Sequence, residues 1–125
     1  PEPNKAEITA IVGDIQGKDC IIVDDIVDTA GTLCAAADKL MELGANSVEA
    51  VISHGVLSRD AIQKINASSL RKLVITDSIP LPESKKSNKI EVITLAPLLK
   101  ETIASLEEGR SLSTTFLSFE EQIIK

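Results

Sequence analysis

Short apolar runs alternate along the chain with segments whose apolar residues recur at helical spacing. Unbroken β-branched runs such as residues 20–23 (Cys-Ile-Ile-Val) are typical of strands buried on both faces of a parallel sheet. Apolar residues three and four positions apart instead line one side of a helix. We therefore predict strands over residues 8–15, 20–23, 48–53, 73–76 and 90–95, and helices over residues 32–43, 58–66 and 96–107.

Residues that start or stop helices bound the predicted helical segments. Gly44 follows the first helix, where a C-cap glycine is expected, and Gly109 breaks the last one. Ser58 is a candidate N-cap for the middle helix. In the last helix we expect Leu98, Leu99, Ile103 and Leu106 to face inward.

The alternation of strands and helices predicts an α/β fold. Right-handed β-α-β units give a mainly parallel sheet with helices on both faces. In such sheets ligands bind beyond the carboxyl ends of the strands. The segments that follow the strands are therefore where a functional site is expected.

Composition narrows the class of protein. The 125 residues are 43% hydrophobic and 26% charged, which is ordinary for one globular domain or a piece of one. Thirteen basic residues against nineteen acidic ones give a net charge of −6, so the basic face that nucleic-acid binding needs is not expected. No apolar run approaches the roughly 18 residues of a membrane span.

The cysteines and the first residue indicate the compartment. Cys20 and Cys34 both lie in apolar segments without Cys-x-x-Cys spacing, so a disulfide framework or a structural zinc site is not expected. A reducing cytoplasm fits best. The chain begins at Pro1 without an apparent signal peptide, and we expect either processing or a longer parent chain.

Three acids follow the buried run of residues 20–23. Asp24 and Asp25 come where that strand is predicted to end. Adjacent carboxylates there can accept hydrogen bonds from a vicinal diol or hold the water shell of Mg²⁺. Asp28 follows them and suits a role in capping loop amides or acting as a base.

A turn of small residues leads from these acids into the predicted helix. Thr29, Ala30, Gly31 and Thr32 offer successive backbone amides and two hydroxyls at a helix N-terminus, an arrangement that suits a phosphate. A diol reader and a phosphate cradle a few residues apart have the reach of a pentose 5-phosphate. We call residues 24–32 the acidic segment.

The acidic segment (Asp-Asp-Ile-Val-Asp-Thr-Ala-Gly-Thr) resembles the phosphoribosyl pyrophosphate (PRPP) loop of type I phosphoribosyltransferases and PRPP synthetases. Flanking segments favour the ribose-phosphate pyrophosphokinases. The resemblance covers residues 1–116, which would form the C-terminal part of the catalytic domain. Residues 117–125 would then be a C-terminal tail. The flanking segments are 3–7 (PNKAE), 11–14 (IVGD), 53–55 (SHG), 76–80 (TDSIP) and 111–113 (SLS) with Phe116.

The resemblance implies a reaction and a role for the acidic segment. This family transfers the diphosphoryl group of ATP to O1 of ribose 5-phosphate, giving PRPP and AMP, with Mg²⁺ required. By resemblance, Asp24 and Asp25 hold the ribose hydroxyls, and residues 28–32 hold the 5-phosphate. The family also forms dimers that assemble into hexamers.

Other parts of the family's machinery are expected outside this sequence or at its end. The catalytic Lys and Arg would fall just before Pro1, with the ATP-binding and metal-ligating residues further upstream, so the segment alone is expected to be inactive. Ser111, Ser113 and Phe116 resemble the stretch where these synthetases bind a regulatory phosphate or ADP.

Two other functions remain open. A PRPP-using phosphoribosyltransferase would share the acidic segment, but it would need a region that reads a nucleobase, and nothing aromatic supplies one here. A non-catalytic paralogue that regulates true synthetases would have no need to keep Asp24, Asp25 and Thr32 together.

Overall fold

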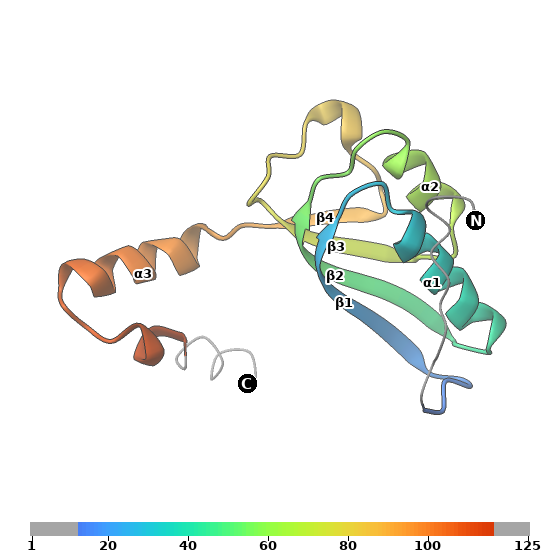
Figure 1. Ribbon diagram of the computed structural model, residues 1–125, viewed down its shortest axis with the longest axis horizontal. Helices are drawn as coiled ribbons and strands as arrows, with labels where there is room; N and C mark the ends of the chain where they lie inside the picture. Colours follow the sequence, from blue (N-terminus) through green and yellow to red (C-terminus); the bar gives the residue numbers. More distant parts are fainter. Residues whose placement is uncertain (1–12, 117–125) are drawn as a thin grey trace, which may run out of the picture. The chain divides into compact units, whose positions relative to one another are not determined.

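The computed structural model describes residues 13–116, in two compact units that divide between Ile93 and Thr94. The first contains the parallel sheet and two helices (Figure 1), and the second contains the last helix. The elements are β1 Asp19–Val27, α1 Gly31–Glu42, β2 Ser47–Gly55, α2 Ala61–Ala67, β3 Lys72–Thr76, the 3₁₀ turn Glu83–Lys85, β4 Ile90–Ile93 and α3 Ala96–Glu107.

The four strands form one parallel sheet in the order β1-β2-β3-β4. Asp24 of β1 lies opposite Ile52 of β2, and Ile52 lies opposite Ile75 of β3. Because all four strands run the same way, their carboxyl ends meet at one edge of the sheet. The α/β class and the parallel sheet predicted from the sequence are confirmed.

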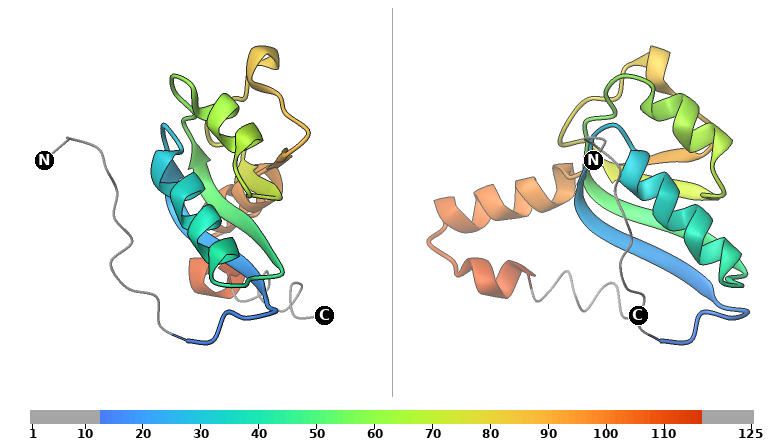
Figure 2. Two further views of the ribbon diagram at one scale, coloured as in Figure 1. Left: turned by 90° about the vertical axis from the view of Figure 1, so that its right-hand side faces the viewer. Right: turned by 45° about the vertical axis from the view of Figure 1, so that its right-hand side comes forward.

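Both α1 and α2 pack against the same face of the sheet (Figure 2). Leu33 and Ala37 of α1 and Ile65 of α2 join every second residue of β2 and β3 in one buried cluster. Ala37 and Ile65 have no exposed surface. This core fixes where the loop between β1 and α1 lies.

The other face of the sheet is uncovered within this unit. Ile21, Val23 and Val51, which point away from α1 and α2, are 63%, 77% and 44% exposed. We call these three residues the open face. The sequence predicted that residues 20–23 form a strand buried on both faces, with helices on both sides. In residues 13–93, however, α1 and α2 lie on one side only.

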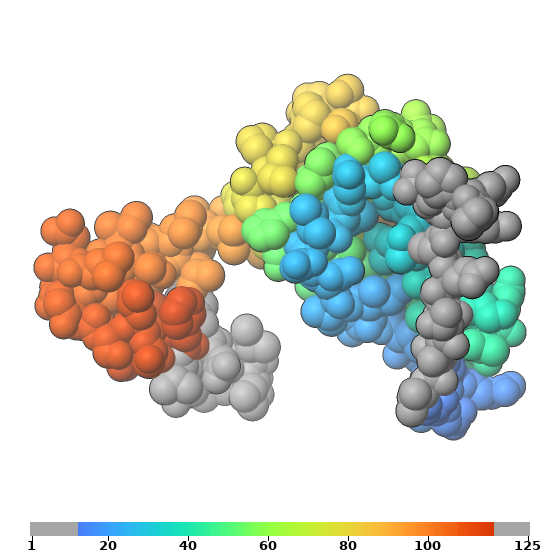
Figure 3. All heavy atoms as spheres, in the orientation of Figure 1, coloured from blue at the N-terminus to red at the C-terminus, as the bar shows by residue number. Residues whose placement is uncertain are grey.

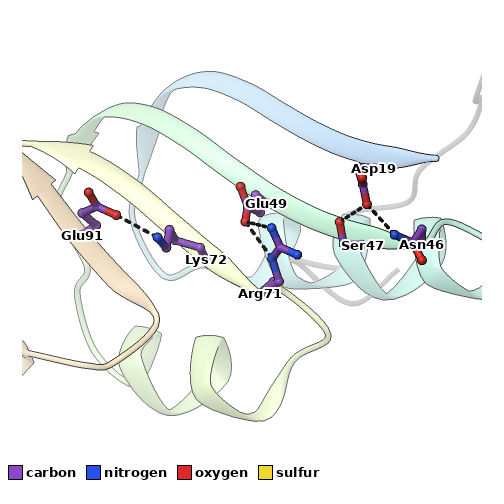
Figure 4. A network of polar contacts seen from close by, with 7 residues as sticks. All are labelled: Asp19, Asn46, Ser47, Glu49, Arg71, Lys72 and Glu91. Carbon is purple, nitrogen blue, oxygen red and sulfur yellow. Dashed lines mark hydrogen bonds and ion pairs between the residues drawn. The ribbon is translucent and has the colours of Figure 1, made fainter.

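Polar side chains lie on the side of the sheet opposite α1 and α2, near the amino ends of the strands (Figure 4). Ser47 and Asn46 donate hydrogen bonds to Oδ1 of Asp19, at 2.6 and 2.7 Å. These bonds hold the pKa of Asp19 below its usual value. Beside them, Arg71 donates to Glu49, and Lys72 pairs with Glu91, which raises the pKa of Lys72.

Several predicted element bounds differ from the structure. Of the strand predicted over residues 8–15, only 13–15 are described, and these are not in a strand. Helix α2 begins at Ala61 with Asp60 at its N-cap, so the prediction that Ser58 caps it was wrong. The 3₁₀ turn lies in a stretch for which no element was predicted, and β4 ends at Ile93 rather than at the predicted residue 95.

The second unit contains α3, whose predicted bounds of 96–107 are confirmed. Gly109, with φ +65°, follows its end. The prediction that Leu99, Ile103 and Leu106 face inward was wrong, because their exposed fractions lie between 54% and 63%. The predicted tail, residues 117–125, lies outside the described residues.

Candidate functional site

The acidic segment begins inside a strand rather than after it. β1 runs on to Val27, so Asp24 and Asp25 are its sixth and seventh residues. Pairing with β2 continues to Ile26 and Val27, which lie opposite His54 and Gly55. Both carboxylates are exposed, and they lie near the edge where the strands end.

A pocket of about 310 Å³ lies between this end of β1 and the start of α1. Its lining includes Asp24 of β1 and the residues from Asp28 to Thr32, which lead into α1. Ile22 and Ile52 form part of its apolar wall. Of the seven residues predicted from the sequence, the structure brings six together in this lining: Asp24, Asp28, Thr29, Ala30, Gly31 and Thr32.

Asp25 is the residue that the structure separates from the others. Side chains alternate between the two faces of a strand, and Asp25 does not line the pocket. Its backbone amide instead donates to Oδ1 of Asp24, at 2.8 Å. This bond orients the Asp24 carboxylate at the pocket.

The turn before α1 has the geometry of an anion cradle. Ala30 is the N-cap with φ 63° and provides no side-chain hydrogen bond. The first amides of a helix have no partner within the helix, and no acidic residue stands in the first turn of α1. These amides and the positive end of the helix dipole favour a negatively charged ligand.

The segment after β2, which sequence reasoning missed, supports the acidic segment. Figure 3 shows these two segments on the surface near each other. The amides of Val56 and Ser58 donate to the carbonyls of Val27 and Asp28, at 2.9 and 3.0 Å. The Ser58 hydroxyl donates a hydrogen bond to Oδ1 of Asp28. No local sequence pattern signals this contact between residues thirty positions apart.

The described residues do not supply a magnesium ligand set. No group of three or more His, Cys, Asp or Glu side chains in residues 13–116 is arranged to hold a metal ion. Asp24 and Asp28 line the pocket, and Asp25 does not. No step of a mechanism is therefore assigned to a metal held by these residues.

The other residues considered from the sequence lie elsewhere. Ser111, Ser113 and Phe116 are exposed in the second unit. His54 lies in β2, and its Nδ1 is 2.7 Å from Oγ of Ser78. No helix among the described residues has the length and apolar character that a membrane crossing needs.

Comparison with known proteins extends these observations over most of the chain. The sequence profile of the phosphoribosyl synthetase-associated domain matches residues 2–117. The ribose-phosphate pyrophosphokinases of Aquifex aeolicus (strain VF5) and Oceanobacillus iheyensis are 48% and 51% identical to the chain over 116 residues. Each of these matches covers 93% of this chain and 37% of the relative.

A solved structure agrees with the fold. The crystal structure of phosphoribosylpyrophosphate synthetase from Mycobacterium smegmatis matches with a TM-score of 0.76 and 40% sequence identity. That match covers 78% of this chain and 33% of the other chain.

The chain thus spans little more than a third of the length of these curated relatives. The matches do not support the expectation that it corresponds to the C-terminal part of a synthetase. They establish the family itself, because the profile covers nearly the whole chain. The chain belongs to the phosphoribosyl synthetase-associated domain family.

Proposed function

We propose that this chain supplies the ribose 5-phosphate subsite of a ribose-phosphate diphosphokinase, an enzyme that makes PRPP and AMP from ATP and ribose 5-phosphate. The observation that carries the proposal is one pocket lined both by the carboxylate residue Asp24 and by the residues at the start of α1, a helix without a side-chain cap. The names of the relatives support the same reaction.

Each part of the pocket has a role in this proposal. The amides at the start of α1 and the hydroxyls of Thr29 and Thr32 bind the 5-phosphate, and Asp24 accepts hydrogen bonds from the ribose hydroxyls. In the reaction, O1 of the sugar attacks the β-phosphorus of ATP, and the bond from that phosphorus to the α-phosphate oxygen breaks. Phosphoryl transfer depends mainly on positioning and charge neutralisation, and the pocket provides the positioning of the sugar.

The remaining chemistry is assigned to residues outside this sequence. By the family resemblance, the catalytic Lys and Arg, the ATP site and the Mg²⁺ ligands of the proposed enzyme belong there. Asp25, which is outside the pocket lining, has the weakest support of the proposed sugar ligands. A regulatory phosphate or ADP site at Ser111, Ser113 and Phe116 stays a prediction.

The setting of the enzyme is part of the same proposal. We place it in the cytoplasm, where Cys20 and Cys34 would remain the free thiols that the structure contains. Burial raises the pKa of Cys34 and keeps that thiol unreactive. Assembly into homodimers and hexamers is supported by the family resemblance alone.

The test is AMP release from ATP that depends on ribose 5-phosphate, measured on the full-length protein. Asp24→Ala should raise KM for ribose 5-phosphate far more than KM for ATP, because Asp24 lines the sugar pocket. Glu107→Ala, which removes an exposed carboxylate of α3 in the other unit, is the matched control and should change neither. Equal effects of Asp24→Ala on both substrates would remove its assigned role.

The same assay separates the two alternatives. A phosphoribosyltransferase would consume PRPP and a nucleobase and release no AMP. A regulatory paralogue would be inactive by itself and would change the rate of a true synthetase added to it. Phe116 is the one aromatic residue within 13–116, so the described residues contain little to stack on a base.

A further inference from the structure

Backbone strain is concentrated around the proposed pocket. In residues 13–116, the non-glycine residues with positive φ are Ala30, Leu57 and Arg59, at 63°, 50° and 54°. They lie in two segments, the acidic segment and residues 56–60 after β2. Such conformations are costly and persist only where surrounding structure holds them in place. Leu57 is completely buried, so the core holds the second segment in its strained form.

Three backbone hydrogen bonds join the two segments. The amides of Val56 and Leu57 both donate to the carbonyl of Val27, at 2.9 and 3.3 Å, and the amide of Ser58 donates to the carbonyl of Asp28. The strained segment therefore presents the Ser58 side chain to the residue that opens the turn of the pocket.

The Ser58 hydroxyl forms a hydrogen bond with that turn and does not cap α2, the helix that follows it. It donates to Oδ1 of Asp28, whereas α2 has no side-chain cap and begins three residues later. A serine just before a helix commonly caps it. Here the hydroxyl bonds across thirty positions to a residue of the pocket lining.

We infer that Ser58 is a positioning residue for the phosphate end of the pocket, acting through Asp28. Its hydrogen bond turns the Asp28 carboxylate toward the segment after β2, which reduces its repulsion of a bound phosphate. It also holds the turn at Ala30, from which the first amides of α1 follow. This inference rests on the proposed function, because it assumes that the pocket binds a phosphorylated sugar.

The test measures ribose 5-phosphate binding to the full-length protein by calorimetry, together with KM for both substrates. Ser58→Ala should weaken binding of ribose 5-phosphate about tenfold, the scale of a lost hydrogen bond to a charged group. KM for ATP should stay unchanged, and Ser58→Thr, which keeps the hydroxyl, should restore the affinity. Ser87→Ala is the matched control, because Ser87 also donates to a side chain distant in sequence, that of Asn66, outside the pocket.

A double substitution separates positioning through Asp28 from a direct contact with the ligand. If Ser58 acts through Asp28, then adding Ser58→Ala to Asp28→Ala should weaken binding no further. A further tenfold loss in that background would overturn the inference, as would unchanged affinity in Ser58→Ala alone. Those outcomes leave the proposed function intact, whereas a wild-type protein that does not bind ribose 5-phosphate would overturn both.

Discussion

Gly55, the last residue of β2, packs against the core so closely that even a methyl group should destabilise the fold. A Cβ atom placed on it would lie 2.7 Å from Cδ1 and 3.2 Å from Cγ2 of Ile75, which is 1% exposed. Ordinary van der Waals contact begins near 3.4 Å, so Ile75 would have to move within a filled core. Overpacking of this kind costs about 1–3 kcal/mol.

The assay for Gly55→Ala is urea unfolding of the protein, in which the midpoint should fall while the slope stays unchanged. Gly31→Ala is the control, because the nearest atom to its new Cβ would be Oγ1 of Thr29 at 3.9 Å. Ile75→Val removes the Cδ1 atom and by itself costs about 0.5–1.5 kcal/mol. The loss of unfolding free energy in the double variant should be smaller than the sum of the losses in the two single variants.

Strict additivity of Gly55→Ala and Ile75→Val would refute this reasoning, because the contact with Cδ1 would then not be the cause of the loss. An unchanged midpoint in Gly55→Ala would do the same. Either result would mean that β2 and β3 separate at this end more easily than their pairing at Ile52 and Ile75 indicates.

Three further predictions concern the pocket, the polar contacts of Asp19 and the open face. Gly31→Val should leave unfolding by urea nearly unchanged, since its surroundings are open, yet raise KM for ribose 5-phosphate by obstructing approach to the backbone. Because the pKa of Asp19 is lowered, its contribution to stability is present at neutral pH and is lost as the pH falls below about 4. Unfolding followed by circular dichroism across this range should show that Asp19→Asn lacks this loss of stability. If further parts of a longer protein cover the open face, Val23→Lys should change the unfolding free energy of the 125-residue chain by less than about 0.5 kcal/mol and that of the full-length protein by more. Equal changes in both would contradict such cover.

Local pattern was sufficient to predict most elements, because each has a strong period. The helical spacing of Leu33 and Ala37 follows from their place in the core, and the glycine at position 44, with φ +94°, ends the helix where predicted. β1 was predicted too short because carboxylates are rare in strands. Pairing with β2 keeps Asp24 in the strand in spite of that preference.

The candidate site was predicted in part for the same reason. The residues of the turn, from Asp28 to Thr32, are contiguous in sequence, so one motif brought them together. The sequence grouped Asp25 with Asp24 because the strand was expected to end before them. The strand instead extends past both, and neighbouring side chains in a strand point to opposite faces. Ser58 was missed because its partner is decided by how two loops pack, and no local pattern contains that information.

The open face and the position of the pocket have one explanation in the winding of the sheet. From β1 to β4 each strand is added on the same side, and right-handed connections then place α1 and α2 on one face. Helices can cover the face opposite α1 and α2 only if the strand order reverses, with further strands added beyond β1. In such sheets ligands bind at the point where the strand order reverses. The acidic segment runs from the last residues of β1 to the start of α1. We therefore expect the longer relatives to continue the sheet past β1 and cover Ile21, Val23 and Val51, which would make the unbroken apolar run of residues 20–23 the two-sided strand that its sequence indicates.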